Sequence, residues 1–288
     1  MPRILIFTDE PDWHARRLLS AFARRGAIAT TRSLRQCAFV LAADGPRIAF
    51  GDQPLPDAVL VRMIATGSFE QVTLRLSFLH ALSLAGVPVI NDARAIERCV
   101  DKSMTSFLLH RAGIPTPLTI VSEDPSEATR ALARRDCDWV VKPLFGSQGR
   151  GLVRLAAGSA LPPAEEVAGV YYLQKFVGRP AGWRDLRVMV IGGKVVTAML
   201  RHGASWITNV HQGARCEATP VTARLAELSL AAAAAVGADY AGVDLIETDD
   251  GELLVLEVNS MPAWQGLQRV ATRDVALALA DHVLERIA

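Results

Sequence analysis

The N-terminal third of the chain alternates short apolar runs with longer segments whose apolar residues recur at helical spacing. Strands are predicted at 4–7, 27–30, 40–42, 58–61 and 87–90. Helices are predicted at 12–25 and 69–84. Because strands that alternate with helices form parallel sheets covered by those helices, the pattern predicts a small α/β domain over residues 1–92.

The pattern changes after Asp92. The predicted elements are helices at 93–100, 102–111, 126–135, 222–236 and 272–287, and strands at 117–121, 139–142, 151–155, 186–191, 194–200, 241–247 and 253–259. The last four strands are expected to form two hairpins, because Gly192-Gly193 and Asp250-Gly251 stand at their centres. This predicts an α+β unit over 93–288, with a smaller subdomain at about 115–180.

The composition excludes several classes of protein. The chain has 31 Lys+Arg and 30 Asp+Glu, a net charge of +1, which argues against a nucleic-acid-binding protein with a basic face. Apolar residues make up 50% and charged residues 21%, which excludes a disordered chain. We find no membrane-spanning run and no signal peptide. The four cysteines form no Cys-x-x-Cys, so we expect a reduced, cytoplasmic protein without a zinc site or disulfides.

The last predicted hairpin carries two acids that should face each other. With a two-residue turn at its centre, Asp244 falls opposite Glu257, and Asn259 points to the same side as Glu257. Facing carboxylates repel by up to about 1 kcal/mol unless a cation lies between them. Oxygen ligands from Asp, Glu and Asn suit Mg²⁺. The alternative is a solvated face with Arg or water around each acid. The opposite face is predicted to pack in the core through Val243, Leu245, Leu256 and Val258.

A glycine-rich loop follows the strand predicted at 139–142. Residues 140–151 read Val-Val-Lys-Pro-Leu-Phe-Gly-Ser-Gln-Gly-Arg-Gly, so the strand ends on Lys142, one of only four lysines in the chain. Such a loop can lay backbone N–H groups along phosphate oxygens while the lysine supplies positive charge. It matches neither a Walker loop nor Gly-x-Gly-x-x-Gly. The alternative is an ordinary flexible hairpin loop.

Together these motifs resemble the ATP-grasp superfamily and, within it, the RimK-like α-L-glutamate ligases. In the family's order, the motifs are Asp101-Lys102, residues 140–151, Gln174-Lys175-Phe176-Val177, Asp185-Leu186-Arg187, Asn209 and Leu256-Glu257-Val258-Asn259-Ser260. The resemblance runs from about residue 90 to the C-terminus. It implies that 1–92 is an α/β pre-ATP-grasp domain and that 93–288 is an α+β ATP-grasp fold whose two subdomains clamp ATP, the lid-like one being 115–180.

The resemblance also implies a role for each motif residue. The ATP site would comprise Lys102, Lys142, Gly146, Ser147, Gln148, Gly149, Gly151, Gln174, Lys175, Phe176, Val177 and Asp185. In it, the lysines and glycine loop would hold phosphates, 174–177 would line the adenine with Lys175 presenting its backbone, and Asp185 would approach the ribose. Two Mg²⁺ ions, with Mn²⁺ as an alternative metal, would be bound by Asp244, Glu257 and Asn259. The catalytic residues facing the phosphoryl and acyl groups would be Arg187, Arg201 and Asn209.

The implied activity is an ADP-forming carboxylate–amine ligase that works through an acyl phosphate. Its partners would be L-glutamate and a carboxylate acceptor, either a pterin- or furan-type cofactor or a protein C-terminus. Ser260-Met261-Pro262 replaces the Ser-Pro-Gly of ribosome-modifying members, which favours the cofactor, and Trp264 would either stack on a flat acceptor or simply pack. Ile207 stands where those ligases often carry arginine, which puts one contact with the phosphate or the acyl group in doubt.

A homo-oligomer formed through the N-terminal domain is compatible with the sequence. The alternatives are a non-catalytic ATP-binding regulatory protein and a ligase making another peptide-like product.

Overall fold

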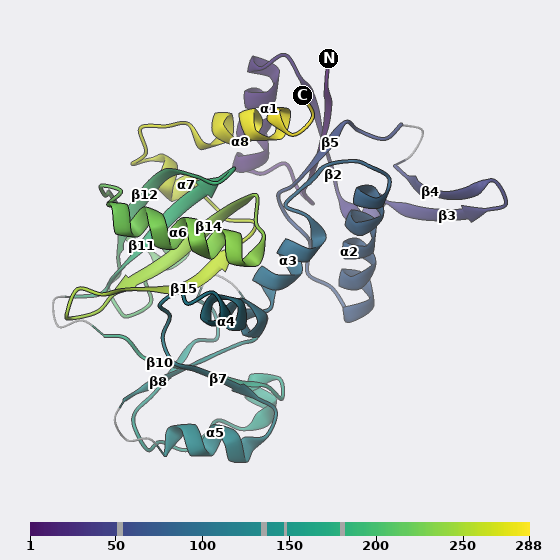
Figure 1. Cartoon of the computed structure of the whole chain (residues 1–288). Coiled ribbons are helices and arrows are strands. Elements are labelled where there is room, and N and C mark those ends of the chain that lie inside the picture. Colours follow the sequence, from purple (N-terminus) through teal and green to yellow (C-terminus); the bar gives the residue numbers. More distant parts are fainter. Residues whose placement is uncertain (51–53, 134–136, 147–148, 179–181) are drawn as a thin grey trace.

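The computed structural model describes residues 1–50, 54–133, 137–146, 149–178 and 182–288. Its N-terminal part contains the predicted parallel sheet (Figure 1). The strands lie in the order β2 (Ile28–Arg32), β1 (Arg3–Phe7), β5 (Ala58–Val61) and β6 (Val89–Ile90). Ile4 and Ile6 pack on the side of α1 (Trp13–Arg24) and α8 (Val275–Glu285), whereas Leu5 and Phe7 pack on the side of α2 (Phe69–Leu84) and α3 (Ala93–Val100). The C-terminal helix therefore completes the N-terminal core.

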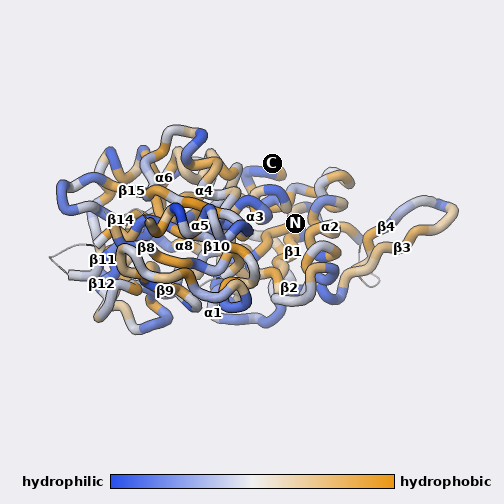
Figure 2. Tube along the Cα trace, turned by 90° about the horizontal axis from the view of Figure 1, so that it is seen from below, coloured by the Kyte–Doolittle hydropathy of each residue, from blue (hydrophilic) through white to orange (hydrophobic). Residues whose placement is uncertain are grey.

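The strand predicted at 40–42 does not join this sheet. It is part of β3 (Ala38–Ala42), which, among the described residues, pairs only with β4 (Gly45–Ala49) in a separate antiparallel hairpin. The hairpin projects from the body of the molecule in both views (Figures 1 and 2).

The described residues of the rest of the chain form two antiparallel sheets. The smaller has the order β7 (Thr119–Ser122), β10 (Tyr171–Lys175), β8 (Trp139–Lys142) and β9 (Val153–Leu155), with α5 (Pro125–Leu132) packed against it. The larger has the order β13 (Arg215–Ala218), β12 (Lys194–His202), β11 (Arg184–Ile191), β14 (Tyr240–Glu247) and β15 (Leu253–Asn259). Helices α4 (Lys102–Arg111) and α6 (Ala223–Val236) cover one face of the larger sheet, and α7 (Gln265–Gln268) precedes α8.

Helix capping fixes the first lysine of the site. The side chain of Asp101 accepts hydrogen bonds from the backbone N–H groups of Ser103 (2.8 Å) and Met104 (3.2 Å). Asp101 is thus the N-cap of α4, which makes Lys102 the first helical residue. Among the described residues, no helix has both the length and the apolar character needed to cross a bilayer.

Candidate active site

Asp244 and Glu257 face each other across β14 and β15, as the sequence predicted. The two-residue turn from which that pairing was predicted is wrong. The backbone N–H of Thr248 donates to the carbonyl of Glu252 (2.8 Å), so the turn is longer and the pairing beyond it is offset by one residue. A β-bulge at Leu256 removes the offset and restores the pair of acids.

The bulge also changes which residues enter the core. Leu256 was predicted to pack there, but Val255 is the residue that is fully buried with Leu245. Leu256 is only partly buried and lines the cavity beside Glu257. The inserted residue thus adds an apolar side chain to the site.

Asn259 extends the acidic pair. Its Nδ2 donates a hydrogen bond to Oε1 of Glu257 (3.0 Å) on the same face of β15. Two carboxylates and an amide oxygen fit a hard divalent cation such as Mg²⁺. No cluster of three or more His, Cys, Asp or Glu side chains suited to a metal occurs in the described part of the chain. A cation bound at Asp244 and Glu257 would therefore complete its coordination with water or with oxygens of a ligand.

Two arginines on neighbouring strands hold Asp244. Arg187 on β11 donates to the carboxylate through Nε and through Nη2 (2.6 Å). Nη2 of Arg201 on β12 lies 3.0 Å from Oδ2 of Asp244, and Arg201 also donates to both oxygens of Asp185 (2.7 and 2.5 Å). All four side chains are buried. Burial alone would raise the pKa of Asp244, but the two arginines outweigh it and hold that pKa well below its usual range.

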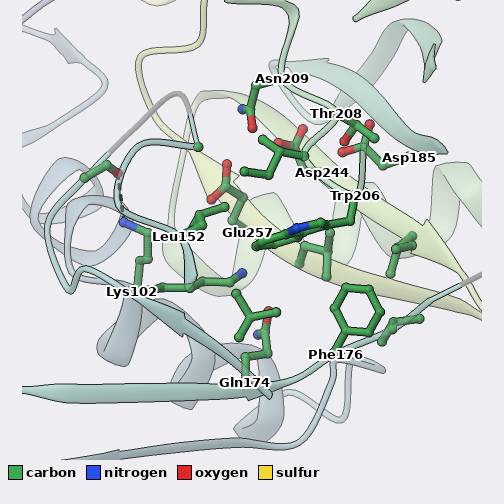
Figure 3. Close-up of a pocket in the computed structure, with 18 of the residues that line it drawn as sticks. Lys102, Leu152, Gln174, Phe176, Asp185, Trp206, Thr208, Asn209, Asp244 and Glu257 are labelled. Atoms are coloured by element: carbon green, nitrogen blue, oxygen red, sulfur yellow. Dashed lines mark hydrogen bonds between the residues drawn. The ribbon is translucent and has the colours of Figure 1, made fainter. Parts of the chain in front are cut away.

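Two lysines lie on the opposite wall of the cavity. The ammonium of Lys102 donates to the carbonyls of Gly146 (2.8 Å) and Leu144 (3.3 Å), which ties α4 to the glycine-rich loop (Figure 3). Lys142, at the end of β8, lines the same cavity. Burial lowers the pKa of both lysines, and the nearby carboxylate of Glu257 opposes this. Bound phosphate groups would relieve the cost of burying these two charges.

The other end of the cavity is apolar and aromatic (Figure 3). The rings of Phe176 and Trp206 meet edge to face, with centroids 5.9 Å apart. The guanidinium of Arg154 lies 3.8 Å from the centre of the Phe176 ring and holds it in place. Elsewhere the apolar lining of the cavity includes Val140, Leu152, Val177, Ile207, Ile246 and Leu256. A flat apolar group fits this end.

The backbone of 174–177 is largely fixed by the smaller sheet. The N–H of Lys175 donates to the carbonyl of Leu118, and the N–H of Phe176 donates to that of Asp138, both at 2.8 Å. These two N–H groups are therefore occupied, so an adenine edge would have to meet other backbone groups of the segment.

Most of the predicted residues line one cavity. They are Lys102, Lys142, Gly146, Gly149, Gln174, Lys175, Phe176, Val177, Asp185, Arg201, Asn209, Asp244 and Glu257. Arg187 and Asn259 instead line a second cavity, of about 780 Å³, which also has Arg201, Asn209 and Glu257 in its wall. Gly151 lines neither cavity; its φ is +70°, and a Cβ added there would lie 2.8 Å from Cγ of Pro143. Ser147 and Gln148 lie outside the described residues.

Sequence reasoning predicted Phe176 at the adenine end but missed its aromatic neighbour Trp206. Trp206 lies in the loop after β12, three residues before the motif residue Asn209, and that proximity was the available signal. Trp264, considered as a stacking surface, is only 1% exposed and packs in the core, so stacking on an acceptor there is wrong.

Two family descriptions match the chain. The RimK-like ATP-grasp domain matches residues 99–283, and the RimK pre-ATP-grasp domain matches residues 2–96. The chain belongs to the RimK-like ATP-grasp family. Membership confirms the predicted pre-ATP-grasp and ATP-grasp architecture and the expectation of an ATP-grasp ligase.

Curated relatives of this RimK-like protein are named as glutamate ligases. It is 45% identical over 205 residues to the tetrahydromethanopterin:alpha-L-glutamate ligase of Methanococcus maripaludis, covering 69% of this chain and 70% of the relative. The enzyme of the same name from Methanosarcina acetivorans is 32% identical over 302 residues, covering 91% and 92%. Among solved structures, the ATP-grasp ligase PsnB with Mg and ADP superposes with a TM-score of 0.78 at 23% identity, covering 99% and 98%, which shows the shared fold.

Proposed function

We propose that this RimK-like protein joins the amino group of L-glutamate to a carboxylate of a small-molecule acceptor and converts ATP to ADP. The observation that carries the proposal is the opposition of two walls in one cavity. Asp244 and Glu257 project from the larger sheet, while Lys102 and Lys142 come from α4 and β8. Acids for a cation and lysines for phosphate, beside an aromatic pocket, suit a metal-bound nucleoside triphosphate.

ATP would bind with its adenine against the wall formed by Phe176 and Trp206 and its phosphates toward the lysines. Asp185 lines the same cavity and would approach the ribose. The glycine-rich loop and the 115–180 subdomain would close over the phosphates and exclude water. Closure matters because water would hydrolyse an acyl phosphate.

Asp244, Glu257 and Asn259 would hold two Mg²⁺ ions, which neutralise phosphate charge when bound. An oxygen of the acceptor carboxylate attacks the γ-phosphorus of ATP, the bond from that phosphorus to the bridging oxygen breaks, and ADP leaves. The glutamate nitrogen then attacks the acyl carbon, the bond to phosphate breaks, and the nitrogen loses a proton to give the amide. Lys102 and Lys142 balance the charge of the phosphates throughout.

Arg201 and Asn209 lie where the two cavities meet, so they would face the phosphoryl group as it moves. Arg187 opens onto the second cavity and would orient the acyl group. Both guanidinium groups pair with aspartates through Nε and Nη2, so each would meet a ligand oxygen through Nη1.

The relatives support the choice of substrates. Those from two methanogens are named for ligating α-L-glutamate to tetrahydromethanopterin, and one of them shares 45% of 205 aligned residues with this chain. A pterin-type acceptor is therefore the first to test, and a protein C-terminus the second.

The test is Mg²⁺-dependent ADP release by the purified protein, with a small-molecule extract of the producing cells, with and without L-glutamate. We expect glutamate-dependent release, loss of release in Glu257→Gln, and an acceptor heavier by one glutamyl residue in the mass spectrum. ADP release that does not depend on glutamate would show that the protein uses a different amine donor. Nucleotide binding without release under any of these conditions would favour a regulatory ATP-binding protein instead.

A further inference from the structure

The second cavity lies between the N-terminal sheet and the ATP-grasp part of the chain. Its wall is formed on one side by residues that follow β5 and on the other by the segment after β15. It shares Gly146, Arg201, Asn209 and Glu257 with the nucleotide cavity. A molecule in the second cavity would therefore reach the phosphoryl end of the nucleotide, and its remote end would touch the N-terminal part.

Arg62 is the cation at that remote end. It follows β5 directly and is only 5% exposed. Its Nη1 donates to the carbonyl of Met261 (3.1 Å), and its guanidinium lies 5.2 Å from the ring centre of Trp264. Its buried Nε has no hydrogen-bond partner within the described part of the chain. The guanidinium is thus only partly satisfied within the described residues, and a ligand in the cavity would meet it at its Nη groups, because Nε is enclosed by protein.

The nearest acid does not complete the hydrogen bonding of Arg62. Oδ2 of Asp12 is 4.0 Å from Nη2 of Arg62, beyond hydrogen-bond distance. The Asp12 carboxylate already accepts from the N–H of Ala15 (2.8 Å) and from Nδ1 of His14 (2.8 Å). Asp12 is therefore occupied in capping α1 and orienting His14.

The hydrogen bonds of His14 show which groups carry charge here. Its Nε2 accepts from the backbone N–H of Trp264 (3.1 Å), so the ring proton is on Nδ1, where it is donated to Asp12. His14 is consequently a neutral imidazole, and the positive charge at this end of the cavity belongs to Arg62. Arg269 lines the same cavity and adds a second, exposed cation.

We propose that Arg62 binds a substrate carboxylate that stays ionised during the reaction, so that the N-terminal domain takes part in substrate recognition. This rests on the proposed function, in which both the amino acid and the acceptor carry carboxylates. A guanidinium fork matches a carboxylate in geometry and charge. The partly buried Ile64 and Met261 line the same cavity and make its surroundings less polar, which would strengthen such a pair.

The experiment measures binding rather than turnover. Calorimetric titrations of the full chain, with ADP and Mg²⁺ present, use L-glutamate in one arm and glutarate, a dicarboxylate without an amino group, in the other. Wild type is compared with Arg62→Gln and Arg62→Lys, and melting temperatures are recorded for all proteins without ligand. Arg75→Gln is the matched control, because Arg75 is equally buried in the same domain but lines neither cavity.

We expect Arg62→Gln to weaken binding of the recognised dicarboxylate roughly 10- to 100-fold, the loss of one charge-assisted hydrogen-bonded contact. Arg62→Lys should retain part of the affinity, and Arg75→Gln should retain all of it. An effect confined to L-glutamate identifies the amino-acid substrate as the ligand, and an effect confined to glutarate identifies the acceptor side.

A structural role for Arg62 gives a different result. The melting temperature of ligand-free Arg62→Gln would then fall while its affinities stayed at wild-type values, and this would overturn the assignment. A wild type that binds neither probe would also overturn it. Failure of the proposed function gives a different result. If the wild type binds a probe through Arg62 but releases no ADP, the carboxylate site stands and the proposed ligase activity fails.

Discussion

Arg187 and Asp244 form a buried, two-pronged ion pair between adjacent strands β11 and β14. Asp244 is thus both the centre of a charge cluster with Arg187 and Arg201 and half of the acidic pair with Glu257. The two acids play different structural parts, although both are proposed metal ligands. Glu257 has no arginine partner among the described residues, whereas removing Asp244 leaves one buried guanidinium without its main acceptor.

Asp244→Asn should therefore lower both stability and activity, and Glu257→Gln should lower activity alone. Breaking a buried pair costs about 3–5 kcal/mol, which would be visible as a large fall in melting temperature. Both variants should lose at least about 100-fold in Mg²⁺-dependent ADP release, because each removes a carboxylate from the proposed metal site. Differential scanning calorimetry and steady-state kinetics on the same preparations would measure the two effects.

The control is Glu252→Gln, which changes an exposed acid in the turn of the same hairpin. It should leave both quantities unchanged. Wild-type ADP release by Glu257→Gln would remove the basis for a metal site on this hairpin.

Trp206→Ala should raise the KM for ATP roughly tenfold or more and change kcat little. Stacking of a base on an aromatic side chain contributes about 1–3 kcal/mol to binding, and Trp206 lines the apolar end of the cavity beside Phe176. Trp183 is the matched control. Its ring also meets that of Phe176, with centroids 6.0 Å apart, but it does not line the cavity. Equal effects of Trp183→Ala and Trp206→Ala would mean that both act only by supporting Phe176.

The sequence was sufficient to predict those parts of the site that local rules determine. Lys102 and Lys142 stand at a helix start and a strand end, where capping and periodicity fix their positions. The pairing of Asp244 with Glu257 was predicted correctly from a wrong turn, because the bulge at Leu256 shifts the register back by one residue. Bulges depend on what packs against each face of a sheet, so hairpin length alone could not reveal this one.

The parts that the sequence could not predict depend on contacts between distant segments. Arg62 and Trp264 are about 200 residues apart in the chain, and only the docking of the N-terminal sheet against the segment after β15 brings them together. The pairing of Arg187 with Asp244 likewise required the neighbouring order of β11 and β14, which no motif encodes. Arg187 and Arg201 were expected to face a ligand. Only the structure shows that they form ion pairs with Asp185 and Asp244.

Gly149→Ala should lower kcat/KM for ATP at least about tenfold. Gly149 has a φ of +70°, and a Cβ there would lie 2.5 Å from Oδ1 of Asn209 and 2.8 Å from Cγ2 of Ile207. The substitution must therefore move either the glycine-rich loop or Asn209, and both belong to the proposed phosphate site. Steady-state kinetics with varied ATP would measure this.

Gly169→Ala separates the clash from backbone strain. Gly169 has a similar φ of +76°, and a Cβ added there would meet no other atom within 4 Å. The variant should lose about 1 kcal/mol of stability from the left-handed backbone and keep its kinetics. Matching losses of kcat/KM in the two variants would show that strain, rather than the contact with Asn209, explains the first result.

His14 should make the protein less stable as the pH falls below about 6.5, the ordinary pKa of histidine. Burial lowers the pKa of His14, and the nearby charge of Arg62 lowers it further, against the opposing hydrogen bond to Asp12. Between the lowered folded-state pKa and the ordinary value, the unfolded chain binds more protons, so the free energy of unfolding decreases as the pH decreases through this window. Denaturant melts at a series of pH values would measure the slope.

His14→Gln should flatten that slope, since glutamine does not titrate but can still accept from the N–H of Trp264. His110→Gln, at an exposed position on α4, should keep the wild-type slope.

A second readout links this prediction to the carboxylate site: in Arg62→Gln the NMR-detected pKa of His14 should rise, because the cation that depresses it is gone. Binding of a dicarboxylate to wild type should raise the same pKa, since a bound anion neutralises Arg62. If the pKa of His14 is the same in wild type, in Arg62→Gln and in wild type with a bound dicarboxylate, the charge of Arg62 does not act on His14.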